Sequence, residues 1–269
     1  MAFKRFVALG DSCTEGLHDL YPGSKRYRGW ADLAATTLAA AEPGLRYANL
    51  GVRGRRLDQI IVEQVPTALD LQPDLIALFG GANDVMTRNF RAEVVAKRVD
   101  AAVRILTRAT PAVAVFTLSD VSNRVPGLLR IRPRLEALNE AIRAAAHKYG
   151  ALLVDLADED VTDLRYFGPD RLHLSEAGHR RLAAHLLGRL EIPFDPAWLQ
   201  PLPGEPLRPG LLAHARWMWR EVLPVAMTRT RNWFVGRSPG DGFTAKQPEL
   251  LPVLADEMNP WISAIPGNA

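Results

Sequence analysis

Five short apolar runs recur along the chain, and longer segments of mixed polarity separate them. The runs do not alternate apolar with polar residues, a pattern typical of strands buried on both faces of a parallel sheet. We therefore expect strands at residues 6–9, 46–50, 75–79, 113–118 and 152–156.

The segments between these runs have the periodicity of amphipathic helices. In 131–149, for example, Leu135, Leu138 and Ile142 recur at helical spacing. Ser175 has the character of a helix N-cap, and Glu176 follows it where the helix dipole favours an acid. Helices are therefore predicted at residues 30–42, 57–71, 90–109, 131–149 and 175–190.

Regular alternation of strand and helix predicts the α/β class, with a parallel sheet covered by helices on both faces. Its crossover connections should be right-handed. Ligand sites in such sheets lie at the carboxyl ends of the strands. Candidate chemistry is therefore expected just after each strand.

The sequence changes in character after residue 191, with six prolines between 193 and 209 and five of the six tryptophans at 198 or later. Residues 208–237 carry six arginines and a single acid, Glu221. We therefore divide the chain into a domain at 1–192 and a C-terminal extension at 193–269 that packs on the domain or on a partner subunit.

Two interpretations of the extension stay open. One is a packed arm with its arginines in water. The other is a basic amphipathic surface for anionic lipid, although Pro224 would interrupt a long helix there.

Composition narrows the function classes. The 269 residues carry a net charge of +3, too mild a balance to indicate nucleic-acid binding. Cys13 is the single cysteine, which excludes an intrachain disulfide and a cysteine metal cluster. The first apolar run is too short for a signal peptide, and no run has the length of a spanning helix. A cytoplasmic location is expected.

Four of the predicted strand ends are followed by residues that could take part in catalysis. Gly-Asp-Ser occupies 10–12, an asparagine-to-glycine block occupies 49–54, Gly-Gly-Ala-Asn-Asp occupies 80–84, and Gly-Pro-Asp-Arg-Leu-His occupies 168–173. Together they offer a hydroxyl, a glycine backbone, a side-chain amide and a carboxylate–imidazole pair. These are the groups that acyl transfer requires.

Ser12 alone could simply cap a helix, and it becomes a nucleophile only if a base such as His173 removes its proton. The imidazole in turn needs an acceptor such as Asp170 to fix its tautomer, which requires a tight turn between the two residues. Donors for an oxyanion would be the backbone N–H groups of Ser12 and Gly54 and the amide of Asn83.

These four blocks, in this order, resemble those of the SGNH, or GDSL, hydrolases, over about residues 3–190. The resemblance implies a flavodoxin-like three-layer α/β/α sandwich with five parallel strands in the order 2-1-3-4-5. It also implies ester hydrolysis without metal or cofactor, a triad of Ser12, Asp170 and His173, and an oxyanion hole of Ser12, Gly54 and Asn83.

A carbohydrate O-deacetylase or an acyltransferase using the same triad is the alternative within enzymes. A binding module that has lost activity is disfavoured, because none of the catalytic positions is substituted. The expected partner is a small-molecule ester, with a membrane-surface or homo-oligomer contact through the extension as a further possibility.

Two positions depart from the usual family pattern. Arg55 and Arg56 follow the glycine of the second block, and we interpret them as a solvated surface pair rather than as a site for an anionic substrate. Cys13 follows the candidate nucleophile, and we interpret it as a small buried packing residue. Histidines other than His173, including His18, are interpreted as structural or surface residues.

Overall fold

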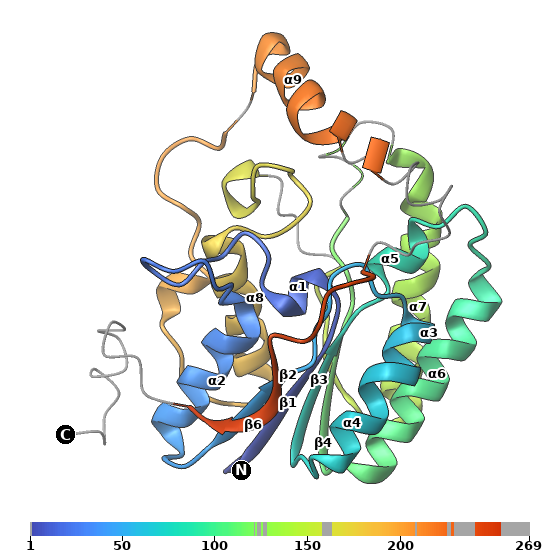
Figure 1. Ribbon diagram of the computed structural model, residues 1–269, viewed down its shortest axis with the longest axis vertical. Coiled ribbons are helices and arrows are strands. Elements are labelled where there is room, and N and C mark those ends of the chain that lie inside the picture. Colours follow the sequence, from blue (N-terminus) through green and yellow to red (C-terminus); the bar gives the residue numbers. More distant parts are fainter. Residues whose placement is uncertain are drawn as a thin grey trace.

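The computed structural model describes residues 2–120, 122, 125, 128–157, 163–207, 209–224, 227–228 and 240–253. Within these residues the chain forms a six-stranded sheet with strand order β5-β4-β3-β1-β2-β6 (Figure 1). The strands are β1 (Arg5–Gly10), β2 (Arg46–Asn49), β3 (Leu75–Phe79), β4 (Ala112–Phe116), β5 (Leu152–Val154) and β6 (Gln247–Pro252).

The first five strands are parallel, and their order confirms the predicted 2-1-3-4-5 arrangement. Gly10, the last residue of β1, pairs with Phe79, the last residue of β3. The two strands therefore end at the same level, and the segments that follow them start side by side.

The expectation of a five-stranded, wholly parallel sheet is wrong in one respect. β6, from the segment assigned to the extension, runs antiparallel to β2 and pairs Leu251 with Tyr47. It supplies hydrogen-bond partners to a strand that would otherwise form the sheet edge. Its sequence, QPELLP, contains two prolines and no β-branched residue, which is why no strand signal marked it.

Helices cover both faces of the sheet (Figure 1). One face carries α2 (Gly29–Ala41) and α8 (Glu176–Arg189). The other carries α3 (Leu57–Gln59), η1 (Ile60–Gln64), α4 (Val65–Asp70), α6 (Ala92–Ala109) and α7 (Arg132–Tyr149). The predicted helices are confirmed, with shifts of one or two residues at their ends, and Ser175 caps α8 by accepting the Gly178 N–H.

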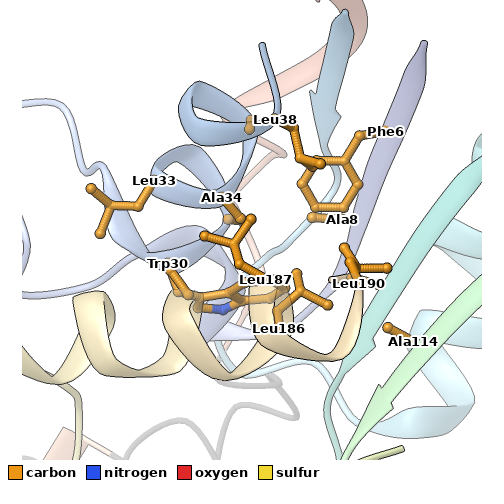
Figure 2. Packing of buried hydrophobic residues seen from close by; sticks show 14 of the residues in the cluster. Phe6, Ala8, Trp30, Leu33, Ala34, Leu38, Ala114, Leu186, Leu187 and Leu190 are labelled. Atoms are coloured by element: carbon orange, nitrogen blue, oxygen red, sulfur yellow. The ribbon is translucent and has the colours of Figure 1, made fainter. Parts of the chain in front are cut away.

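Alternate residues of β1 point to opposite faces and seed two apolar clusters. Phe6 and Ala8 pack beneath α2 and α8 (Figure 2). Trp30 of α2 belongs to the same cluster and is fully buried. Val7 and Leu9 belong to the cluster on the other face. This explains why the strand sequences are continuously apolar.

Part of the extension is anchored to the same core. The Lys246 ammonium lies 2.8 Å from the Asp32 carboxylate, and both side chains are nearly buried. Asp32 also accepts the hydroxyls of Tyr21 and Tyr47, each at 2.9 Å, so the buried carboxylate is well supplied with donors. The division of the chain at residue 192 stays a prediction.

The remaining short elements are α1 (Ser12–Glu15), α5 (Ala82–Val85), η2 (Leu129–Ile131), η3 (Leu164–Tyr166), η4 (Pro196–Trp198), α9 (Leu211–Trp217) and η5 (Met218–Val222). Among the described residues, no helix combines the length and apolar character that crossing a bilayer requires.

Candidate active site

Ser12 is the first residue of α1 and follows β1 after a single intervening residue. The turn depends on Gly10, whose φ is +152°. A Cβ on Gly10 would lie 2.1 Å from the Phe79 carbonyl oxygen and 2.3 Å from the Thr14 hydroxyl. Only glycine therefore allows the chain to leave the strand so sharply and present Ser12 at the sheet edge.

A hydrogen-bonded chain links Ser12 to His173 and Asp170, three residues that sequence reasoning paired. His173 Nε2 lies 2.8 Å from Ser12 Oγ, and His173 Nδ1 lies 2.5 Å from Asp170 Oδ2. A carboxylate only accepts, so Nδ1 carries the proton and Nε2 is left to accept the serine O–H. This arrangement holds the imidazole in the tautomer that a general base needs.

The segment between Asp170 and His173 makes the tight turn that their pairing requires. Gly168 N–H donates to the His173 carbonyl at 2.8 Å, and Arg171 N–H donates to the Gly168 carbonyl at 2.9 Å. Asp170 Oδ1 accepts the backbone N–H groups of Leu172 and His173, both at 3.0 Å. The carboxylate is thus fixed by its own loop as well as by the imidazole.

His18 is a residue that sequence reasoning missed, because it was interpreted as structural or surface. Its Nε2 lies 3.2 Å from Asp170 Oδ2, on the same oxygen that faces His173. His18 adopts a left-handed φ of +67°, which is uncommon for a residue with a side chain and found mainly where surrounding structure enforces it. The hydrogen bond to Asp170 raises the pKa of His18.

Burial alone would raise the pKa of Asp170. Hydrogen bonds from His173 and His18 outweigh that effect and hold its pKa well below the usual range. Asp170 is therefore ionised at neutral pH and available as an acceptor for His173.

Asn83 and Gly54 lie beside Ser12 on the wall of one cavity. Gly54 has a φ of +76°, in the region that favours glycine. The loop that follows Gly54 is held by Asp84, whose Oδ2 accepts the Leu57 N–H at 2.8 Å. Asn83 Nδ2 donates to Asp11 Oδ2 at 3.0 Å and to the Arg55 carbonyl at 3.2 Å.

Asp11 is a buried carboxylate next to the candidate nucleophile. Burial raises its pKa to about 6, although N–H donation from Cys13 and Asn83 and the nearby His173 act in the opposite direction. The native state therefore binds a proton at Asp11 at pH values where the unfolded chain does not. This predicts a stability that falls as pH rises through that window.

Replacing Asp11 with asparagine should remove this pH dependence. Between pH 4 and pH 7 the free energy of unfolding of Asp11→Asn should rise relative to wild type by about 2 kcal/mol. Urea unfolding of both proteins across that range measures the difference. His179, whose pKa burial lowers to about 4, contributes equally to both proteins and cancels. A difference that is constant with pH would contradict the assignment.

The cavity beside Ser12 has a volume of about 600 Å³ and is mainly apolar. Its two arginines are engaged elsewhere: Arg53 Nε donates to Glu15 Oε2 at 3.0 Å, and Arg181 Nη1 donates to the Leu199 carbonyl at 2.7 Å. Apolar lining residues include Leu17, Phe79, Met86, Leu135, Leu156 and Leu182. A space of this size and polarity can enclose an apolar group attached to a reactive centre at Ser12.

His18, Asp170 and His173 are also the described residues whose ligand atoms, all within 4.8 Å of one another, lie close enough to share a metal ion. Both ring nitrogens of His173 already take part in the chain from Ser12 to Asp170. A metal bound here would have to break that chain.

The family model described as GDSL-like Lipase/Acylhydrolase family matches residues 8–181, more than half of the chain. The protein belongs to this family of esterases. None of the curated proteins compared with the chain matches it.

Solved structures with the same fold include LAE5, an alpha/beta hydrolase enzyme from the metagenome of Lake Arreo, Spain. LAE5 is 23% identical, with a TM-score of 0.60 over 71% of this chain and 97% of its own. Axe2, an acetylxylan esterase from Geobacillus stearothermophilus, is 20% identical, with a TM-score of 0.57 over 73% and 96%.

Three catalytic mutants of Axe2, in which a histidine, a serine or an aspartate is replaced by alanine, match at 19–20% identity and TM-scores of 0.58–0.59. They cover 73–74% of this chain and 96–97% of their own.

The two departures from the family pattern have structural explanations. The interpretation of Arg55 as a solvated surface residue is wrong, because its side chain is only 12% exposed and pairs with Glu63 at 2.8 Å and Asp241 at 3.2 Å. Cys13 is half-buried on the cavity wall and packs against the apolar core. Burial raises the pKa of its thiol well above the usual value, which keeps it unreactive.

Proposed function

We propose that this protein hydrolyses carboxylic esters through an acyl-enzyme formed on Ser12. The observation that carries the proposal is the continuous chain from Ser12 Oγ to His173 at 2.8 Å and from His173 to Asp170 at 2.5 Å. A serine, an aspartate and a histidine are also the residues replaced in the catalytic mutants of the acetylxylan esterase Axe2.

In the proposed reaction, His173 Nε2 takes the proton from the Ser12 hydroxyl as the oxygen attacks the ester carbonyl. The resulting imidazolium is stabilised by ionised Asp170. It then gives the proton to the departing alcohol, which leaves the acyl group on Ser12. A water molecule, activated by the same imidazole, releases the acid and restores the hydroxyl.

The oxyanion of the tetrahedral intermediate is proposed to take donors from Ser12 N–H, Gly54 N–H and the Asn83 amide. Both amide hydrogens of Asn83 are directed to Asp11 and to the Arg55 carbonyl in the absence of substrate. The oxyanion therefore competes with these acceptors, and the longer contact to Arg55, at 3.2 Å, is the easier one to give up.

Replacing Asn83 with alanine should lower kcat by roughly 10²–10³-fold with little change in KM, since the lost donor acts on charge that develops in the transition state. Steady-state kinetics on a soluble nitrophenyl ester measure both constants. Thermal unfolding of the variant separates this effect from the loss of the Asp11 partner. A kcat within about threefold of wild type would remove Asn83 from the proposed oxyanion hole.

His18 is proposed as a positioning residue that acts through Asp170. A hydrogen bond of this kind contributes about 0.5–1.5 kcal/mol, so His18→Ala should lower kcat by roughly 2–10-fold and leave KM unchanged. His18→Gln retains a donor and should recover most of the loss. Loss of kcat in both variants, or an equal change in KM, would contradict this role.

The apolar cavity favours esters with an apolar acyl group over acetylated carbohydrates, the substrates named for Axe2. Burial of each methylene contributes about 0.8 kcal/mol, so kcat/KM should rise by at least about tenfold from nitrophenyl acetate to nitrophenyl octanoate. A parallel assay on acetylated xylo-oligosaccharides tests the deacetylase alternative. Activity confined to acetyl esters would support that alternative instead. The cytoplasmic location stays a prediction.

A further inference from the structure

The helical segment 211–224, formed by α9, η5 and the two residues after them, projects beyond the carboxyl end of the sheet (Figure 1). Its inner side is anchored by Trp217, which is buried and donates its indole N–H to the Pro169 carbonyl at 2.8 Å. The Arg171 guanidinium lies 4.2 Å from the centre of the Trp217 ring, and its Nη1 lies 3.0 Å from His214 Nδ1. The segment is thus fixed to the turn that carries Asp170 and His173.

The outer side of this segment is apolar and exposed. Leu212, Ala215 and Trp219 are spaced three and four residues apart, so they share one helical face, on the opposite side from Trp217. Leu212 is 89% exposed and Trp219 is 73% exposed, and Leu211 beside them is 92% exposed. Adjacent large apolar side chains exposed to this extent indicate a surface that contacts something else.

The helical segment that carries this face has two arginines and one acid. Arg216 and Arg220 are exposed on the same helical segment. The sequence from 208 to 237 holds six arginines and one acid, Glu221. Apolar residues with tryptophan on one side and arginines around them are typical of helices that lie in the interface of an anionic bilayer.

One end of the segment lies next to the cavity. Pro224, at the end of the helical segment, and Thr228 line the cavity that contains Ser12. The segment that carries the outer face therefore also contributes to the wall of the cavity.

We propose that the outer face of 211–224 docks on the surface of an anionic phospholipid bilayer. Apolar side chains would enter the headgroup region, and Arg216 and Arg220 would contact lipid phosphates. A second copy of the chain is a poorer occupant, because a two-fold contact would bring the arginines of both copies together. The proposal concerns binding and does not depend on the proposed catalytic chemistry.

The test uses the full chain in co-sedimentation with vesicles of phosphatidylcholine containing about a third phosphatidylglycerol, compared with phosphatidylcholine alone. Wild type should bind the anionic vesicles, and added salt should weaken binding. The double variant Leu212→Glu/Trp219→Glu should bind at least roughly tenfold less well. Val62→Glu is the matched control, because Val62 is an apolar residue that is 73% exposed on η1, and it should bind as wild type does.

Three outcomes would overturn the proposal. The first is wild-type protein that does not sediment with anionic vesicles, or that sediments equally with neutral ones. The second is vesicle binding by the double variant at the wild-type level. The third is light scattering that shows a wild-type dimer converted to monomer by the double substitution, which would assign the face to a second copy. Melting temperatures of both variants, measured beside that of wild type, are the check that the substitutions leave the fold intact.

Discussion

Replacing Ser12 with alanine should lower kcat for ester hydrolysis by roughly 10³-fold or more, with no loss of fold. Its hydroxyl is the group proposed to form the acyl-enzyme, because His173 Nε2 faces it at 2.8 Å. Ser12 is only half-buried on the cavity wall, so removing its oxygen leaves no cavity in the core. Initial rates on nitrophenyl butyrate, with circular dichroism for the fold, provide the measurement.

Ser119→Ala is the matched control for this variant. Ser119 lines the same cavity, and its substitution should leave kcat within about twofold of wild type. A Ser12→Ala protein that retains a tenth of wild-type kcat would show that another group carries the acyl transfer.

His173→Ala should be as damaging as Ser12→Ala, and the double variant should be no worse than either single variant. Residues that act as one unit lose their function together, so a second substitution removes little more. Asp170→Asn should be less damaging, because it preserves the shape of the side chain while removing the charge. Kinetics of the four variants on one ester measure the coupling.

His147→Ala, at an exposed position of α7, is the control for histidine loss and should retain wild-type activity. Additive losses in the Ser12→Ala/His173→Ala protein would show that the two residues act separately. Such a result would contradict the hydrogen-bonded chain as the working unit.

The parallel core of the fold was predictable because continuous apolar runs in the sequence mark its strands. Phe6 and Ala8 pack under one helical layer while Val7 and Leu9 pack under the other, so every position of β1 from 6 to 9 is buried and apolar. The candidate site was predictable for a related reason. Parallel strands end at one edge, and residues that follow different strands are brought together there.

The sequence did not predict β6, because this strand is held by hydrogen bonds to the edge strand β2 and does not bury both of its faces. In Gln247–Pro252 only Leu250 is buried, and the prolines resemble those of a loop. Antiparallel edge strands tolerate such sequences, so the strand is visible only from its partner β2.

His18 was misjudged because its partner is remote in sequence, and the same is true of one of the two partners of Arg55. His18 meets Asp170, and Arg55 meets Asp241, across separations of 152 and 186 residues. Nothing local distinguishes such a residue from a solvated one. The cavity walls share this difficulty, since Leu135 of α7 and Leu182 of α8 approach Ser12 only through packing of the two helical layers.

The most direct test of the proposed acyl-enzyme chemistry is covalent labelling by a fluorophosphonate, followed by mass mapping of the modified peptide. The account predicts one adduct, on the peptide that contains Ser12, formed slowly or not at all in His173→Ala and absent from Ser12→Ala. An adduct on any other serine, or undiminished labelling of the Ser12→Ala protein, would contradict it.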